Sequence, residues 1–202
     1  NTGVGYRALY SNTTASNNTA VGYQAAYSNT TGSPVTAVGI QAGYNNTTAG
    51  GNTYIGRVAG YSNSTGTNNS YIGDAVAYYQ TGTGNTALGW SSFVGASGTS
   101  TGTSNSAFGR YSQYAFTSGS YNASLGTSSL QSNTTGSSNT AIGLQALASN
   151  TTASENTAVG YQALYSNTTG TVNTAIGTYA LNKTTTGGSN SALGYASLYQ
   201  NT

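Results

Sequence analysis

The stretch that decides the fold is Asn156–Gly170, which reads NTAVGYQALYSNTTG. Nearly the same fifteen residues occur at Asn18–Gly32, where Ala26 stands in place of Leu164. Each copy contains a short apolar segment, a glycine and a polar segment that ends in Asn-Thr-Thr-Gly. Because the two copies stand far apart in a chain of 202 residues, an internal repeat is the first hypothesis to test.

The glycine that follows the apolar residue recurs along the whole chain with a 17-residue period. Only the steps on the two sides of Gly89 depart from this period, the first being shorter by one residue and the second longer by three. A chain with only a biased composition does not hold its phase in this way, so the spacing predicts twelve structural repeats. These marker glycines are Gly5, Gly22, Gly39, Gly56, Gly73, Gly89, Gly109, Gly126, Gly143, Gly160, Gly177 and Gly194.

The positions around the marker have a constant character. The residue before it is Val, Ile, Leu or Phe in every repeat, and the residue four before it is Asn in all repeats but one, which has Val35. Short segments rich in Gly, Thr, Asn and β-branched residues disfavour helix. We therefore expect a strand through 157–161, a second strand near 163–166 and a turn over 167–170.

These expectations define the fold class as all-β, a parallel β-solenoid or β-roll of about twelve 17-residue coils with no helix. One coil cannot bury its apolar residues alone, whereas stacked coils ~4.8 Å apart can. Residues 1–202 form a single repeat array with irregular coils at about 74–109. We interpret the array as a fragment of a longer fibre, because the chain begins and ends within a coil. Stacking also predicts that Asn amides hydrogen-bond from coil to coil.

The orientation of the strand residues follows from hydrophobicity. We expect the aliphatic residue before the marker, such as Val159, to point into the core. Its neighbours Ala158 and Gly160 would then point outward and form a smooth face, interrupted at Tyr54 and Tyr71, along which a second chain can approach closely. The sequence thus predicts self-association, either as a homotrimer or end to end as a filament.

The composition argues against several classes of function. Charged residues make up 3% of the chain, with four basic and two acidic residues, no His and no Cys. General acid–base catalysis needs positioned titratable groups, so we expect no catalytic residue and no enzyme activity. Without His or Cys we expect no metal site and no cofactor. Four Lys and Arg residues are too few to bind nucleic acid, and no apolar run is long enough to contact a membrane as a spanning helix.

Three groups of residues are candidates for sites, and each has a structural alternative. A row of Asn-x-Ser/Thr sequons lies seven residues after a marker, and these residues are candidate glycosylation sites unless the Asn serves only the turn. A row of Tyr lies five residues after a marker, as a candidate aromatic strip for carbohydrate or as a stabilising ladder of rings. Trp90 and Phe93 are a candidate binding knob beside the polar run 95–105, or part of a tolerated loop. The sequon row is Asn12, Asn29, Asn46, Asn63, Asn133, Asn150 and Asn167, and the strip is Tyr10, Tyr27, Tyr44, Tyr61, Tyr78 and Tyr165.

The residue directly after the marker is unusual in four successive repeats. It is Arg57, Asp74, Trp90 and then Arg110. Stacking of the coils predicts that Arg57 lies beside Asp74 as an ion pair, and that Arg110 lies near the Trp90 ring as a cation–π contact.

The unit Asn-Thr-Ala-Val-Gly, with a small residue three positions after the glycine, resembles the head repeats of trimeric autotransporter adhesins, which form a left-handed parallel β-roll. The phrase NTAVGYQALYSNTTG also looks like repeat arrays of bacterial and phage tail-fibre-type proteins, and its polar turn is longer than that of the adhesin repeat. The resemblance implies a homotrimeric, extracellular shaft or head on a cell surface or virion surface. We expect a structural fibre shaft or adhesin repeat region, with cell-surface glycans as candidate partners. The alternative is a carbohydrate- or ice-binding β-solenoid that uses the Tyr row or the Thr row (Thr2, Thr19, Thr36, Thr53).

Overall fold

The computed structural model describes residues 1–96 and 100–201 of the chain. These residues contain no helix and twelve short strands, each of which ends at the residue before a marker glycine. The strands are β1 (Thr2–Val4), β2 (Thr19–Val21), β3 (Val35–Val38), β4 (Asn52–Ile55), β5 (Ser70–Ile72), β6 (Thr86–Leu88), β7 (Ser106–Phe108), β8 (Ala123–Leu125), β9 (Thr140–Ile142), β10 (Thr157–Val159), β11 (Thr174–Ile176) and β12 (Ser191–Leu193).

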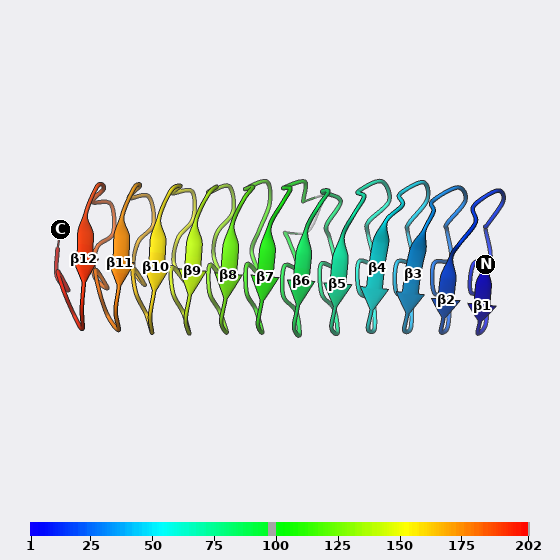
Figure 1. Cartoon of the computed structure of the whole chain (residues 1–202), viewed down its shortest axis with the longest axis horizontal. Helices are drawn as coiled ribbons and strands as arrows, with labels where there is room; N and C mark the ends of the chain where they lie inside the picture. Colours follow the sequence, from blue (N-terminus) through cyan, green and yellow to red (C-terminus); the bar gives the residue numbers. More distant parts are fainter. Residues whose placement is uncertain (97–99, 202) are drawn as a thin grey trace.

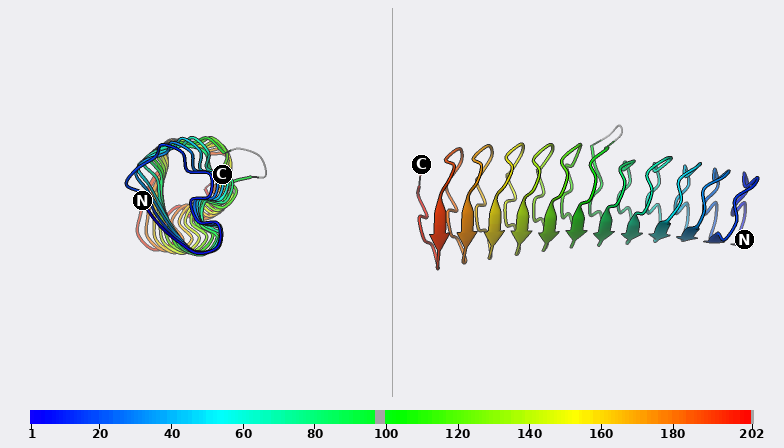
Figure 2. Two further views of the ribbon diagram at one scale, coloured as in Figure 1. Left: turned by 90° about the vertical axis from the view of Figure 1, so that its right-hand side faces the viewer. Right: turned by 45° about the horizontal axis from the view of Figure 1, so that its top comes forward.

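All twelve strands form one parallel sheet, in which each strand pairs with those of the preceding and following coils (Figure 1). The register is constant: Thr157 of β10 pairs with Thr174 of β11, and Ala158 pairs with Ala175. Seen end-on, successive coils nearly superpose and together form a rod (Figure 2). The predicted fold class, a parallel β-solenoid built on a 17-residue repeat, is confirmed.

The sheet continues through the irregular repeats. Thr86 of β6 pairs with Ser70 of β5 on one side and with Ser106 of β7 on the other. These are equivalent positions of their strands, although the repeat before Thr86 is shorter than the regular one and the repeat after it is longer. The change in length is therefore absorbed outside the strands. Residues 97–99, part of the polar run 95–105, lie outside the described residues.

Residues 163–166, which we expected to form a second strand, are a turn instead. The reason lies in the backbone, because Gln162 and Leu164 have left-handed φ angles of 52° and 50°. The chain therefore bends at every second residue. The segment is still tied to its neighbours, with 3.0 Å between Leu164 N and the Ala180 carbonyl oxygen and 3.0 Å between Gln162 N and the Leu144 carbonyl oxygen. Bonds between coils hold this part of the repeat without strand geometry.

The marker glycine stands where successive coils approach most closely. Gly160 has a φ of 136°, a conformation that residues with a Cβ rarely adopt. A Cβ on Gly160 would lie 2.5 Å from the carbonyl oxygen of Gly177 in the next coil. Both the backbone conformation and the distance between coils therefore require glycine, which explains its constancy along the chain.

In β2 to β12 the residue two before the marker glycine lines the core, so the predicted orientation of the strand residues was wrong. Ala158 is fully buried, whereas Val159 is half-buried and belongs to the outer side of the sheet. The interior is narrow, because Ala158 shares it with Ala163 and Leu164 of the turn segment. Hydrophobicity favours the larger Val inside, but beside Ala163 and Leu164 a close-packed interior leaves room only for the smaller Ala.

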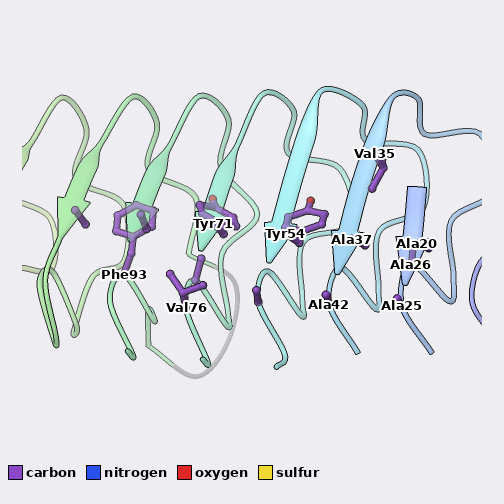
Figure 3. Packing of buried hydrophobic residues seen from close by; sticks show 14 of the residues in the cluster. Ala20, Ala25, Ala26, Val35, Ala37, Ala42, Tyr54, Tyr71, Val76 and Phe93 are labelled. Carbon is purple, nitrogen blue, oxygen red and sulfur yellow. The ribbon is translucent and has the colours of Figure 1, made fainter. Parts of the chain in front are cut away.

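Tyr54 and Tyr71, which we expected on an outward face, point inward and are fully buried (Figure 3). Glycine in the turn segment makes room for them, since a Cβ on Gly43 would lie 2.5 Å from the Tyr54 ring. The Tyr54 hydroxyl accepts a hydrogen bond from Asn63 Nδ2 at 2.6 Å. Burial raises the pKa of both Tyr54 and Tyr71 well above the usual value. Large and small residues are thus paired so that the core stays filled.

Two rows of Asn run along the rod inside the coil. In the row four residues before the marker, the side-chain oxygen accepts a hydrogen bond from the backbone of the next coil, as Asn156 Oδ1 does from Asn173 N at 2.9 Å. In the row seven residues after the marker, several neighbouring amides bond to each other, and Asn167 Nδ2 donates to Asn150 Oδ1 at 3.0 Å. The predicted bonding of Asn amides from coil to coil is confirmed. Buried amides with matched partners help to fix the stacking register.

Candidate functional surfaces

The outer side of the sheet, called the sheet face below, carries two rows of side chains. Residues i and i+2 of a strand point to the same side, so the aliphatic residue and the Thr or Ser two positions before it both face outward. Nine residues of the aliphatic row have 37–79% of their surface exposed. They are Val4, Val21, Ile55, Ile72, Leu88, Leu125, Ile142, Ile176 and Leu193. Val38, Val159 and Phe108, an aromatic residue that holds the same position in β7, are half-buried.

The sheet face replaces the smooth Ala face that we predicted. Its second row includes Thr2, Thr19, Thr36 and Thr53, which pair in register from strand to strand. No charged residue occurs in β1 to β12. A long exposed apolar row is unusual for the surface of a monomeric soluble protein, so the sheet face is a candidate interaction site. The sequence contains a signal for this orientation. Glycine in the turn segment leaves room for the Tyr54 ring, and that room is needed only if the ring points inward.

Five residues of the predicted aromatic strip form a continuous stack on one edge of the coil, called the tyrosine ladder below. Neighbouring ring centroids lie 4.9–5.2 Å apart and the ring planes deviate by only 5–6°. The ladder consists of Tyr10, Tyr27, Tyr44, Tyr61 and Tyr78. Tyr79 contacts its last ring edge-on at 4.7 Å, and Tyr165 lies in a distant coil outside the ladder.

The ladder presents ring edges and hydroxyl groups to solvent, because each ring face covers the next. Aromatic sites that bind carbohydrate by stacking need free ring faces, and every ring of the ladder has a neighbour at ~5 Å on at least one face in this geometry. Burial, and the neighbouring Tyr78, raise the pKa of Tyr61. The carbohydrate strip stays a prediction, and contact with a sugar here would have to use hydroxyl groups and ring edges.

The two contacts predicted from stacking of the residues after the marker are confirmed. Arg57 Nη2 lies 2.7 Å from Asp74 Oδ1, and Arg57 Nε donates to Asp74 Oδ2 at 3.3 Å. The Arg110 guanidinium lies 4.7 Å from the centroid of the Trp90 ring. Exposed contacts of these kinds contribute at most ~1 kcal/mol each, so they verify the register and do not by themselves form a site.

The structure separates the two residues of the predicted knob. Phe93 is fully buried, with its ring centroid 4.5 Å from that of Phe116 and 6.4 Å from that of Tyr71. Trp90 is 45% exposed and belongs to the outer edge. Phe93 is therefore a core residue that continues the row of buried aromatic rings (Figure 3), and only Trp90 is accessible to a partner.

The sequon Asn residues form the second Asn row inside the coil. Their amides also bond within the coil, as Asn167 Nδ2 does to the Gly170 carbonyl oxygen at 2.9 Å. Asn12 is half-buried. The fully buried members are Asn29, Asn46, Asn63, Asn133, Asn150 and Asn167. A glycosylated amide must reach solvent, so glycosylation at these positions stays a prediction that requires attachment before the coil folds.

Comparisons with protein-family models, with curated proteins and with solved structures found no match. Across residues 1–96 and 100–201, no helix has the length and hydropathy needed to cross a membrane. The same residues form no pocket. The chain is a β-solenoid repeat protein, and its candidate functions rest on two extended surfaces, the sheet face and the tyrosine ladder.

Proposed function

We propose that this chain is the repeat region of an extracellular structural fibre or adhesin shaft, in which copies associate side by side through the sheet face. The observation that carries the proposal is the exposed aliphatic row along β1 to β12. Burial of apolar area is the main driving force of protein association. Because the strands contain no charged residue, bringing two such faces together carries no cost for desolvating a charged group of the strands.

The partner that fits this surface best is a second copy of the same chain. Both copies carry a row with the same repeat of ~4.8 Å, so the side chains of one row can interdigitate with those of the other over the whole length. The side chains of a partner without this repeat would match the row over only a few coils. The extracellular location, on a cell or a virion, follows the resemblance to adhesin and tail-fibre repeats.

The size of the sheet face favours a trimer over a dimer. Twelve strands ~4.8 Å apart and three residues wide span roughly 53 Å by 10 Å, or about 500 Å² for each copy. A standard specific interface buries about 800 Å² on each partner. In a threefold arrangement each row contacts two others, so the same side chains bury more surface than in a pair.

Analytical ultracentrifugation tests the proposal. The unmodified chain is expected to sediment as an oligomer, and the variant Ile55→Lys/Ile72→Lys/Leu88→Lys as a monomer, because three buried ammonium groups would oppose the contact. Circular dichroism checks that the variant keeps its fold. The unmodified chain sedimenting as a monomer over the whole accessible concentration range would contradict the proposal.

A matched control places the same charges on another surface. Thr31, Thr48 and Thr65 are exposed on the polar turn, away from the sheet. The variant Thr31→Lys/Thr48→Lys/Thr65→Lys is expected to remain an oligomer. If it dissociates as fully as the sheet-face variant, net charge and not the aliphatic row controls assembly.

A second candidate function, ice binding, is favoured by the Thr row that accompanies the aliphatic row on the same flat face. Hydroxyl and methyl groups there repeat at ~4.8 Å along the rod and ~6.6 Å along each strand, a regular lattice without charge. A thermal-hysteresis assay separates the two functions. Ice binding predicts activity that the sheet-face Lys variant loses and the turn variant keeps, whereas an assembling fibre shows none.

A further inference from the structure

The tyrosine ladder brings accessible phenol rings close together, and neither the packing of the core nor assembly through the sheet face requires this. Its five phenol rings are held in near-contact along the axis of the rod, with centroids 4.9–5.2 Å apart. Tyr10 is 62% exposed, and the other four rings are half-buried, so their edges are accessible from solvent. The rings belong to five successive coils, so any bond between two of them would join coils and not residues within one coil.

The rest of the composition directs oxidation toward these rings. The chain has no Cys and no Met, one Trp and 18 Tyr. Thiols and thioethers, which usually react first with oxidants, are therefore missing. The buried pair Tyr54 and Tyr71, with ring centroids 5.9 Å apart, is shielded from solvent by complete burial. The ladder is the longest accessible series of adjacent phenols in the part of the chain that the structure describes.

We propose that the tyrosine ladder is a site of oxidative cross-linking, at which dityrosine bonds join successive coils. The oxidant is of the class of hydrogen peroxide used by a haem peroxidase. Each of two neighbouring phenols loses one electron and its phenolic proton. The two radicals form one bond between their Cε carbons, and the hydrogen on each of these carbons moves to the phenolic oxygen as the ring becomes aromatic again. In total the two rings lose two hydrogen atoms, and one hydrogen peroxide is reduced to two water molecules.

The geometry favours bonds within one chain over bonds between chains. A radical on Tyr44 has the rings of Tyr27 and Tyr61 at 5.0 and 5.1 Å on its two sides, whereas a ring of another molecule must first arrive by diffusion. Side chains at a surface change rotamer on the picosecond to nanosecond scale, which allows the two ring edges to meet. Each bond would close a loop of one repeat and fasten the rod along its axis.

The experiment compares two variants after treatment with peroxidase and hydrogen peroxide at low protein concentration. Tyr27→Phe/Tyr61→Phe keeps a continuous stack of rings but leaves the remaining ladder phenols ~9.6 Å apart. Tyr121→Phe/Tyr165→Phe removes the same number of phenols outside the ladder. Dityrosine fluorescence is expected to fall by about a third to a half in the first variant, because contacts between adjacent rings supply the bonds. Pairs outside the substituted positions, such as Tyr6 with Tyr23 and Tyr78 with Tyr79, keep their contacts. In the second variant the fluorescence is expected to stay near that of the unmodified chain.

Mass and stability provide independent readouts. The oxidised chain is expected to keep its monomeric mass under denaturing conditions, less two hydrogen atoms for each bond. Its urea midpoint is expected to rise after oxidation, and that of the ladder variant to rise less. Equal fluorescence from the two variants, or dityrosine found only in covalent dimers, would overturn the proposal. These readouts do not depend on assembly through the sheet face, so a monomeric chain would refute the fibre contact and leave this test intact.

Discussion

Replacement of Gly160 by Ala tests whether the distance between coils fixes the marker glycine. The added Cβ would lie 2.5 Å from the carbonyl oxygen and 2.6 Å from the carbonyl carbon of Gly177. Both atoms belong to the backbone, so a side-chain rotation cannot relieve the clash and one coil has to move. The φ of 136° at Gly160 adds strain of about 1–3 kcal/mol for a residue with a Cβ.

The movement weakens hydrogen bonds on both sides of the contact. Gly177 N donates to the Val159 carbonyl oxygen at 2.8 Å, and Tyr179 N donates to the Tyr161 carbonyl oxygen at 2.9 Å. Losing two such bonds costs about 2 kcal/mol in net stability. With the strain included, Gly160→Ala is expected to lower the free energy of unfolding by about 3–5 kcal/mol.

Gly194 offers a matched control in the same column. Its φ is 117°, and a Cβ there would have no atom within 4 Å. Gly194→Ala therefore carries the strain without the clash, and a loss of only about 1–3 kcal/mol is expected. Urea unfolding followed by circular dichroism measures both variants. If they lose the same free energy, the backbone angle alone explains the glycine and the argument from coil spacing is refuted.

Three further predictions concern the core, the buried phenols and the Asn row. Gln113 Nε2 donates to Ser124 Oγ at 2.8 Å inside the coil, and Gln113 Oε1 is buried without a hydrogen-bond partner among the described residues. The double variant Gln113→Leu/Ser124→Ala removes that oxygen and leaves Ser112 Oγ with Ser129 Oγ as its partner at 3.1 Å, so it is expected to gain about 1 kcal/mol; a lower midpoint in thermal unfolding would contradict this. Because burial raises the pKa of Tyr54 and Tyr71 above the usual 10.0, their contribution to stability is complete below about pH 10 and is lost as the pH rises above it, where only the unfolded chain releases the proton readily. Tyr54→Phe is expected to flatten this alkaline loss in urea unfolding at a series of pH values, whatever its effect at neutral pH, and an unchanged slope would exclude Tyr54 as the source. When the chain is made in a glycosylating secretory host, its intact mass is expected to match the 20.2 kDa polypeptide; an excess of several hexose units would show that Asn167 or its equivalents are modified before folding.

The spacing of the marker glycines predicted the parallel pairing and the register of the strands. Hydrogen bonds between coils require the same phase in every coil, so a 17-residue period in the sequence becomes a constant register in the sheet. The contact between Arg57 and Asp74 followed from that phase alone, because both residues directly follow a marker. The coil-to-coil bonding of the Asn amides was predictable for the same reason.

The orientation of side chains and the shape of the turn segment could not be read from the period. The rule that larger apolar residues point inward placed Val159 in the core, because it ignores the width of the interior, which fits Ala158. Leu164 has a positive φ that is uncommon for Leu, and the residue types of the segment do not predict it. Hydrogen bonds to the next coil hold that conformation, and they exist only once the stack has formed. The candidate sheet face was therefore missed, although the tyrosine ladder was anticipated from its spacing.

The constant register has a genetic consequence. The near-identical stretches Asn18–Gly32 and Asn156–Gly170 occupy the same phase of their coils, which contain β2 and β10. Recombination between the DNA segments that encode them would remove or duplicate the intervening coils as whole units. The strand after the junction would still meet its neighbour in register, since each coil contacts only the coils beside it. The length of the rod can therefore vary by inheritance while its cross-section stays the same.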